Sequence, residues 1–240
     1  MVIAALSFLT TGLAFLGGSY YTWQDNEKIR STPKSTVRSI SIGRTELHGT
    51  INSEQSITAP ISQKPCVAYH ILVSGGKTRN GMPAGATTKQ DSVPTTLEDS
   101  TGRIRVDLDD VDIKTGHKTY HQFGRNVGDV NDSVQNRLNK AGIDVTLTDG
   151  KAGSTVEERR IDHEDTVYLL GTARDNPDVK DTTAQHNQDD LLITKGNNPF
   201  MISNSSEEDL KQTLSKKTLI TLTLGLLLTI AGTVFLVTPL

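Results

Sequence analysis

The sequence predicts a mainly β soluble domain, built of short strands and a few short helices and flanked by two transmembrane α-helices. Three observations support this fold class. All Lys, Arg, Asp and Glu side chains lie between Asp25 and Lys217, both chain ends are apolar, and several internal stretches alternate apolar with polar residues. Charges are costly at the centre of a bilayer, about 20 apolar residues span it, and a period of two is typical of strands.

The charge pattern divides the chain into five parts. The expected order is a transmembrane helix at 1–23, a linker at 24–36, a β-rich domain at 37–204, a juxtamembrane helix at 205–217 and a second transmembrane helix at 218–240. Tyr20, Tyr21 and Trp23 close the first segment with aromatic rings, which suit the headgroup layer. A cleaved signal peptide is the alternative for this segment, but no basic residue precedes Lys28, so an uncleaved anchor is favoured.

Basic residues flank both apolar segments on the side of the central domain: Lys28, Arg30, Lys34, Arg38, Lys211, Lys216 and Lys217. Because positive flanks stay in the cytoplasm, we expect a two-pass integral membrane protein whose domain faces the cytoplasm. Asn-x-Ser triplets at Asn131 and Asn204 favour the opposite side, where such sites are glycosylated, but they are the weaker signal.

Both apolar ends carry a row of small residues at a spacing of four. These residues are Thr10, Ala14 and Gly18 in the first segment and Thr221, Gly225, Thr229 and Thr233 in the second. Small side chains let helix backbones approach closely in lipid. We therefore expect the helices to pack on each other or on a second copy. The alternative is composition alone, since small residues are common in membrane helices.

Period-two patterns locate the candidate strands of the central domain. The longer ones cover 65–74 and 103–108, and the shorter ones cover 40–42, 47–51, 142–147, 167–170 and 191–194. A phase slip at Asp109 and Asp110 predicts a β-bulge, because the pattern resumes at Val111.

Two helices are expected in or beside the domain. One covers 132–141 and ends at Gly142, and the other starts at a capping box formed by Ser205 and Glu208 and runs on into the second apolar segment. The segments 75–94 and 175–190 are expected to be mobile loops.

Composition and spacing exclude most kinds of chemical site. A net charge of −3 without a basic stripe argues against nucleic-acid binding, and a single Cys excludes an internal disulfide and a Cys-rich metal cluster. Cys66 and His70 would lie about 13 Å apart along a strand, too far for a nucleophile and its base. His117 and His121 are four residues apart and could bind a metal together only on a helix. Gly116, Thr119 and Gly124 argue against a helix there, so a solvated pair is the better interpretation. We expect no catalytic residue, no metal and no cofactor.

Several stretches, taken in order, resemble one family. They are GRTELHGTI at 43–51, APISQKPCVAY at 59–69, LEDSTG at 97–102, ER at 158–159, VYLLG at 167–171, PFMIS at 199–203 and SEEDL at 206–210. In this order between two apolar ends, the sequence resembles the GIDE, or BAM (beside-a-membrane), family, which is related to MULAN-type mitochondrial E3 ubiquitin ligases. The positions that carry the resemblance are Gly43, Gly49, Pro60, Pro65, Cys66, Tyr69, Asp99, Gly102, Glu158, Arg159, Gly171 and Ser203.

The resemblance also shows what is different here. The eukaryotic ligases carry a RING finger after the second span, in which about eight Cys or His ligands hold two zinc ions. This sequence has one Cys and ends at Leu240, so it resembles the short prokaryotic, especially archaeal, form of two spans and a domain. A role in ubiquitin transfer would need a RING supplied by a partner.

The function expected from the sequence is a membrane-anchored, non-catalytic binding or scaffold protein that presents its domain to an unknown protein partner at the bilayer surface. The strand at 65–73 and the segment 75–94 are expected to form the binding edge. An E3 ubiquitin-ligase-like role is the first alternative. A structural membrane-organising homo-oligomer, assembled through the transmembrane helices, is the second.

Overall fold

The structure, a computed structural model, describes residues 2–30, 34–75, 80, 82, 85–123, 132–146, 154–178, 190–197, 199–204 and 207–237. The chain divides into two units. One joins the two ends, Met1–Thr32 and Ser206–Leu240, and the other is Pro33–Ser205. The second unit is mainly β with few helices, as the sequence predicts.

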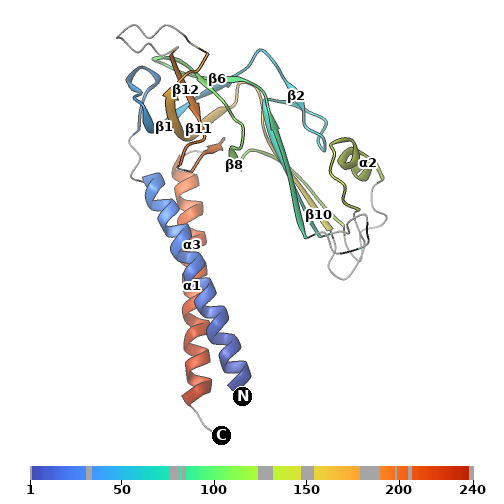
Figure 1. Cartoon of the computed structure of the whole chain (residues 1–240), viewed down its shortest axis with the longest axis vertical. Coiled ribbons are helices and arrows are strands. Elements are labelled where there is room, and N and C mark those ends of the chain that lie inside the picture. Colours follow the sequence, from blue (N-terminus) through green and yellow to red (C-terminus); the bar gives the residue numbers. More distant parts are fainter. Residues whose placement is uncertain are drawn as a thin grey trace. The chain divides into compact units, whose positions relative to one another are not determined.

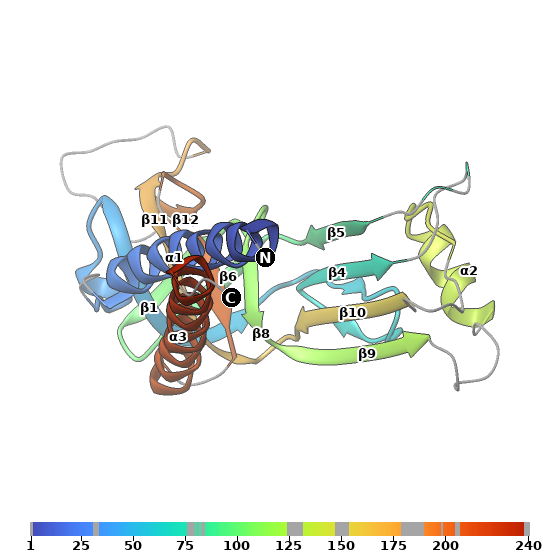
Figure 2. The same cartoon turned by 90° about the horizontal axis from the view of Figure 1, so that it is seen from below.

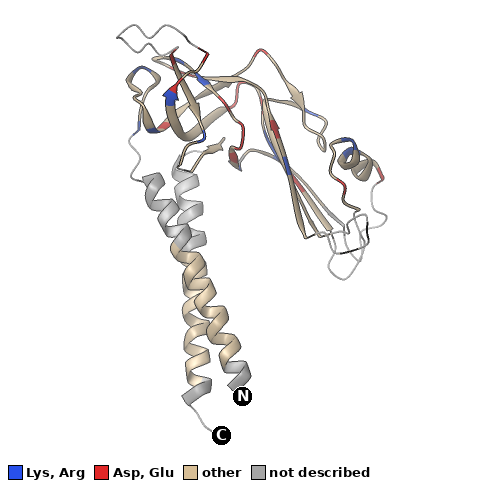
Figure 3. Cartoon of the chain, in the orientation of Figure 1, with Lys and Arg blue, Asp and Glu red and all other residues tan. Residues whose placement is uncertain are grey.

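The first unit is an antiparallel pair of long helices, α1 (Val2–Arg30) and α3 (Glu207–Val237), which lie side by side (Figure 1). Their contact is very close at Gly12, where a Cβ atom would lie 2.5 Å from Thr229 Oγ1 and 3.0 Å from the carbonyl oxygen of Gly225. The described side chains of both helices are uncharged (Figure 3). Among the residues that the structure describes, no helix offers an apolar stretch long enough to cross a membrane.

The contact between α1 and α3 uses part of the expected rows of small residues. Gly225 and Thr229 lie in the contact, and α1 meets them with Gly12, Phe15 and Leu16. The other members of the rows lie outside this contact or at its border: Thr10, Ala14, Gly18 and Thr233 are exposed, and Thr221 is half-buried. A contact stripe at 3.6 residues per turn drifts away from a strict spacing of four, so a row alone does not identify the buried face. Contact with a second copy stays a prediction.

The helix α1 extends to Arg30, and so includes part of the expected linker. At the other end α3 is continuous from Glu207 to Val237, as the capping box predicted for a helix that runs on into the apolar segment. Ser205, the first residue of the predicted capping box, lies outside the described residues.

Five strands of the second unit close a barrel: β1 (Gly43–Asn52), β6 (Thr95–Asp99), β7 (Gly102–Val106), β12 (Leu191–Thr194) and β11 (Thr166–Asp175). They pair in this order, and β11 pairs back onto β1. All these pairs are antiparallel except β7 with β12. This is the arrangement of a five-stranded Greek-key barrel of the OB-fold type. Two short strands extend it, β13 (Met201–Ser203) on β11 and β8 (Asp112–Thr115) on β13.

Alternation along the barrel strands fills the barrel with apolar side chains. Leu47 and Ile51 from β1, Leu97 from β6 and Ile193 from β12 are all buried in one core. The strand β1 pairs with β11 up to Thr50 and with β6 from Thr50 onward. Gly49 lies at this change of partner, where a Cβ atom would collide with the carbonyl oxygen of Glu98. A side chain at this position would push β1 away from β6 and open the barrel.

Two insertions into the barrel build a second lobe. The strands β4 (Ala68–Gly75) and β5 (Ala86–Ser92) come between β1 and β6, and β9 (His117–Phe123) and β10 (Ser154–Ile161) come between β7 and β11. They form one antiparallel sheet in the order β5-β4-β10-β9 (Figure 2). The short hairpin of β2 (Ile57–Thr58) and β3 (Pro65–Cys66) and the helix α2 (Asp132–Lys140) complete this lobe.

One face of the four-stranded sheet forms a second apolar core. Ile71 and Val73 from β4 and Val156 from β10 pack with Val134 and Leu138 of α2. The two helix residues are four apart, so they lie on the same side of α2. The other side of the helix is left for solvent or a ligand.

Most strand and helix predictions agree with the structure, and four do not. Residues 40–42 follow a short 3-10 helix (Val37–Ser39) and form no strand, and 142–146 contribute buried side chains but only one bridge residue. The predicted bulge at Asp109 and Asp110 is a loop between β7 and β8, with Asp110 at φ 60°. The segment 75–94 contains β5, whose residues are too polar to show a period of two. Most of 175–190 lies outside the described residues.

The close contact of α1 and α3 predicts that Gly12→Leu weakens the pair, because the new side chain meets the backbone of α3. Overpacking of this kind costs about 1–3 kcal/mol. The matched control is Gly18→Leu, since a Cβ atom there meets nothing within 4 Å. With dyes at both chain ends, energy transfer should be lost at a lower SDS concentration in Gly12→Leu and not in Gly18→Leu. Equal midpoints for the two variants would contradict the described contact.

Candidate functional site

A groove lies between α2 and the loop that joins β2 to β3, residues 59–64, called here the motif loop. The loop is closed by two backbone hydrogen bonds, from Ala59 N to the Lys64 oxygen and from Gln63 N to the Ala59 oxygen, both 2.9 Å. Gln63 adopts a left-handed conformation with φ 57°. The loop is therefore a compact turn with a defined shape.

Glu158 holds the motif loop on the sheet. It is fully buried on β10, and its carboxylate accepts hydrogen bonds from Ile61 N (2.6 Å) and Ser62 N (3.1 Å). Arg137 of α2 binds the same turn from the other side, because its Nη1 donates to the carbonyl oxygen of Ile61 at 2.6 Å. A buried carboxylate needs such donors, since leaving it unsatisfied would cost several kcal/mol. Three segments far apart in the sequence thus meet at Ile61.

The groove itself has a volume of about 600 Å³. The motif loop and the sheet contribute Thr58, Pro60, Gln63 and Tyr69, and α2 contributes Ser133, Asn136, Arg137, Lys140 and Ala141. The lining therefore contains two cations, several hydrogen-bonding groups and no carboxylate. Its walls are fixed in place by the hydrogen bonds of Glu158 and Arg137, so the groove exists before any ligand arrives.

Cys66 and Tyr69 lie under the motif loop and are chemically quiet. Burial, with the nearby Asp162 and Glu158 carboxylates adding to it, raises the pKa of the Cys66 thiol from its ordinary 9.0 to about 12. Burial and the neighbouring Asp91 raise the pKa of Tyr69 from 10.0 to about 12. A thiol that stays protonated is a poor nucleophile. Cys66 is thus a small buried side chain of the core.

The other positions that carry the family resemblance lie away from the groove. Asp99 and Gly102 form the turn between β6 and β7, where Asp99 accepts hydrogen bonds from Thr101, Gly102 and Val37 N. Although burial opposes it, these hydrogen bonds hold the pKa of Asp99 below its ordinary value. Gly171 lies in the barrel, where a Cβ atom would lie 2.7 Å from Ile193 Cγ2.

Arg159 lies beside Glu158 in the chain but on the opposite face of the sheet. Its Nε lies 2.6 Å from Glu157 Oε1, and its Nη1 donates to the carbonyl oxygen of Ile113 at 2.9 Å. The remaining positions serve the barrel and its extensions: Gly43 begins β1 with φ 125°, and Ser203 is buried in β13. Pro65 begins β3.

The two histidines considered as metal ligands, His117 and His121, are not brought together. His117 Nε2 lies 3.1 Å from Asp165 Oδ1 and 3.6 Å from Asp162 Oδ2, at the turn that joins β10 to β11. His121 lies further along β9. Within the described ranges, no three His, Cys, Asp or Glu side chains are placed to bind a metal ion.

Sequence reasoning missed the contribution of α2 to the groove. Ser133, Asn136, Arg137 and Lys140 follow one helix face at spacings of three and four, opposite Val134 and Leu138. This polar face with two cations was a readable signal. The position of this helix face beside the motif loop could not be predicted, because Tyr69 and Arg137 are 68 positions apart in the sequence and the pairing of β4 with β10 brings them together.

The anchoring role of Glu158 predicts that Glu158→Ala destabilises the protein by about 2–4 kcal/mol, because the buried N–H group of Ile61 and the half-buried N–H group of Ser62 lose their acceptor. Glu158→Gln keeps one acceptor oxygen and should lose less. The measurement is the urea midpoint of the full chain in detergent. Glu98→Gln is the matched control, since Glu98 is exposed on the barrel. Unchanged midpoints in all three variants would exclude the anchoring role.

The raised pKa values of Cys66 and Tyr69 predict a loss of stability in alkali. Between pH 9 and pH 12 the unfolded chain releases these protons and the folded chain keeps them, so folding stability falls as the pH rises. Urea midpoints measured between pH 8 and pH 11 should fall, and less steeply in Cys66→Ser and Tyr69→Phe. A slope that neither substitution changes would show that other groups dominate.

Comparison with known proteins gives one finding on the family. The sequence model of the family GIDE, described as E3 ubiquitin ligase, matches residues 85–236, which is more than half of the chain. The match includes Asp99, Gly102, Glu158, Arg159, Gly171 and Ser203 and begins after the motif loop. No curated protein and no solved structure matches the chain. On the strength of the family match over β5 to α3, this chain belongs to the GIDE family.

Proposed function

We propose that this chain is a membrane-anchored, non-catalytic binding protein that holds an acidic segment of a partner protein in the groove between α2 and the motif loop. The groove is the observation that carries the proposal. Arg137 and Lys140 line it without a carboxylate among the lining residues, and this charge suits Asp and Glu side chains or a carboxyl terminus.

The shape of the groove supports a peptide rather than a large globular ligand. About 600 Å³ is the volume of a small-ligand site and accommodates a few residues of a chain. Pro60 and Tyr69 provide apolar surface, and Asn136 provides a donor and an acceptor for a peptide backbone. Gln63 adds its amide oxygen, since its Nε2 already donates to the Pro60 oxygen at 2.5 Å. Because Glu158 already orders the motif loop, binding need not pay for that ordering.

The expected binding edge along 65–73 needs correction. The strand β4 pairs with β5 on one side and with β10 on the other, so its backbone groups are already used. A partner cannot add a strand there. Tyr69 of this strand still contributes its side chain to the groove.

The membrane anchor is part of the proposal and rests on the chain ends. The first 24 and the last 23 residues carry no charge, and α1 and α3 have 29 and 31 residues. The uncharged parts of these helices, 2–24 and 218–237, are about 35 and 30 Å long at 1.5 Å per residue, close to the thickness of the hydrocarbon core. Contact through Gly12 and Gly225 is the close packing typical of helices in lipid. Flanking basic residues favour a cytoplasmic domain.

Ubiquitin transfer is the alternative that the description of the family favours. The sequence has one Cys and six His residues, fewer than the roughly eight ligands of a two-zinc RING finger. Ubiquitin transfer by these 240 residues would therefore need a RING protein as partner. Discharge of a ubiquitin-loaded E2 by purified chain, with and without a RING protein recovered from the same membranes, separates the two functions. Discharge by the chain alone would overturn the non-catalytic proposal.

The groove predicts that Lys140→Glu weakens partner capture, because it places a negative charge where acidic side chains bind. Crosslinking mass spectrometry on native membranes should show recurrent crosslinks from 58–64 and 133–141 to one protein, reduced about tenfold or more in Lys140→Glu. Arg105→Glu, on the barrel, is the matched control. Crosslinks that both substitutions leave intact would place the partner elsewhere. Release of the chain by alkaline carbonate would separately contradict the anchor.

A further inference from the structure

The strand β5 is an open edge of the four-stranded sheet. It pairs with β4 along its whole length, from Ala68↔Ser92 to Ser74↔Ala86, without a shift in register. In the described part of the domain, no strand pairs with its other side, and it borders the sheet opposite β9 (Figure 2). Five of its seven residues are exposed. An edge of this kind offers unpaired backbone groups to another strand.

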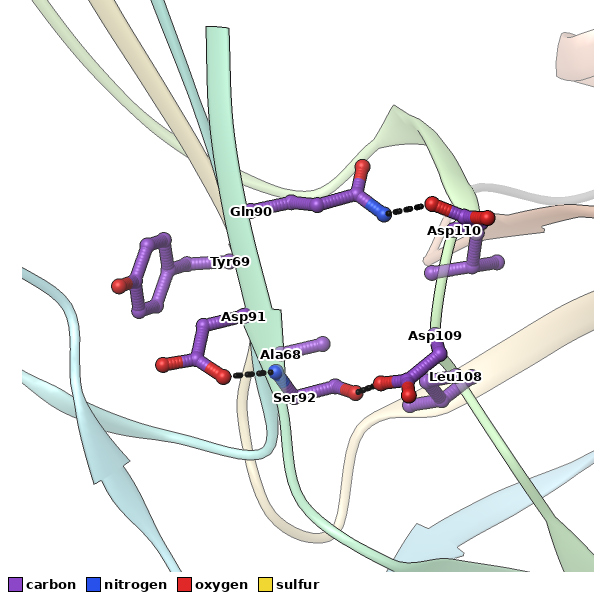
Figure 4. A pocket seen from close by; sticks show the side chains of 9 residues that line it. Ala68, Tyr69, Gln90, Asp91, Ser92, Leu108, Asp109 and Asp110 are labelled. Atoms are coloured by element: carbon purple, nitrogen blue, oxygen red, sulfur yellow. Dashed lines mark hydrogen bonds between the residues drawn. The ribbon is translucent and has the colours of Figure 1, made fainter.

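The edge lacks the usual protection against such pairing. Natural edges are guarded by proline, bulges, or a lysine that repels a second copy. The strand β5 has no proline and no bulge, and its charges are one of each sign, Lys89 and Asp91. They are two apart, so they project from the same face of the strand. The side chain of Asp91 lies on the other side of the strand from the side chains of Gln90 and Ser92, and its Oδ1 accepts a hydrogen bond from Ser92 N at 3.0 Å (Figure 4).

Lys89 and Asp91 make the strand complementary in charge to a second copy of itself. When two copies of β5 pair antiparallel about a two-fold axis at Gln90, Lys89 of each copy lies opposite Asp91 of the other, and Thr88 lies opposite Ser92. Directly opposed side chains have Cβ atoms about 4.5–5.5 Å apart, and opposite charges there attract. An axis at Lys89 would oppose two lysines, and an axis at Asp91 two aspartates. Of these three registers, only the one at Gln90 opposes unlike charges.

The side chains of Gln90 and Ser92, on the opposite face of β5 from Lys89 and Asp91, bind the loop 108–111. Gln90 Nε2 donates to Asp110 Oδ1 at 3.4 Å, and Ser92 Oγ donates to Asp109 Oδ1 at 2.8 Å (Figure 4). A cavity of about 270 Å³ separates β5 from the loop 108–111. Both acceptors lie over the face of the sheet and stiffen the strand. On its outer side Ser92 N already donates to Asp91 Oδ1 at 3.0 Å, so pairing with a second copy would exchange this local hydrogen bond for one to the other strand.

The opposite edge of the sheet does not have this property. On β9, an axis at Tyr120 would oppose Lys118 to Gln122 and His121 to Thr119. Lys118 is also occupied, since its Nζ lies 3.0 Å from Glu157 Oε2 on the neighbouring strand. Self-complementary charge is a property of β5 alone among the two edges of this sheet.

We propose that two copies of this chain pair through β5, with Gln90 on the two-fold axis, and join their four-stranded sheets into one continuous sheet. A two-fold interface uses the same patch on both copies, which is what the Lys89 and Asp91 arrangement provides. The pairing is independent of the groove and of the helix contact, so it goes beyond the proposed function. Anchoring two copies in one membrane would raise their effective concentration.

Disulfide trapping tests the register. In the full chain in detergent, Gln90→Cys should form a covalent dimer on mild oxidation, because paired Cα atoms 4.5–5.5 Å apart suit a disulfide. Thr87→Cys is the matched control, since the register places Thr87 opposite Val93 and its two copies about 20 Å apart. Native Cys66 is buried and gives no background. A dimer from Thr87→Cys and none from Gln90→Cys would overturn the proposal.

Charge reversal tests the chemistry by sedimentation in the same detergent. Lys89→Asp and Asp91→Lys should each weaken dimerisation about tenfold, and the double variant should restore it. Thermal unfolding should be unchanged in all three, which separates a lost interface from a lost fold.

A dimer insensitive to these substitutions but lost in Gly18→Leu would place the interface on the helices. Trapping of Gln90→Cys to a different protein in membranes would identify a foreign strand instead of a second copy. Either outcome would overturn the proposal.

Discussion

The pairing of β4 with β10 is the contact on which the second lobe depends. The two strands belong to separate insertions into the barrel, and they meet over eight residue pairs, from Ala68↔Ile161 to Gly75↔Ser154. Neither insertion could bury its apolar face alone, because a two-stranded hairpin is marginal in water. Once the ladder forms, β5 and β9 can join its two sides and α2 can cover one face.

Glu158 attaches the motif loop to this pair of strands and so forms one wall of the groove. The carboxylate stands on β10 opposite Ile71 of β4, in an apolar core, and the amides of Ile61 and Ser62 satisfy it. The motif loop is therefore tied to the sheet by a group that cannot remain buried without it. Arg137 adds the helix to the same turn. The groove is a consequence of this chain of contacts, and its cations come from the polar face of α2.

The sequence was informative where one element decides the outcome. Alternation located β1, β4 and β7, and Gly142, at φ 77°, ends α2 as expected. It was uninformative for β5, since a strand at a sheet edge need not alternate, and for the 107–111 loop, where a slip in the alternation marks a turn between two strands as readily as a bulge within one. It also could not show which helix face carries the contact, because Gly12 and Gly18 look alike until α3 is placed. The groove depends on side chains from three segments, and no local pattern brings those together.

The family positions explain the fold more than the activity. Gly49, Gly171 and Asp99 close the barrel, and Glu158 builds the groove without lining it. Membership of the GIDE family therefore fits a shared scaffold, while the proposed binding rests on α2 and the motif loop. The most direct test is hydrogen exchange of the chain in native membranes and after purification in detergent. The account predicts slower exchange of 58–64 and 133–141 in native membranes, where the partner is present. Equal exchange of both segments in the two preparations would contradict it.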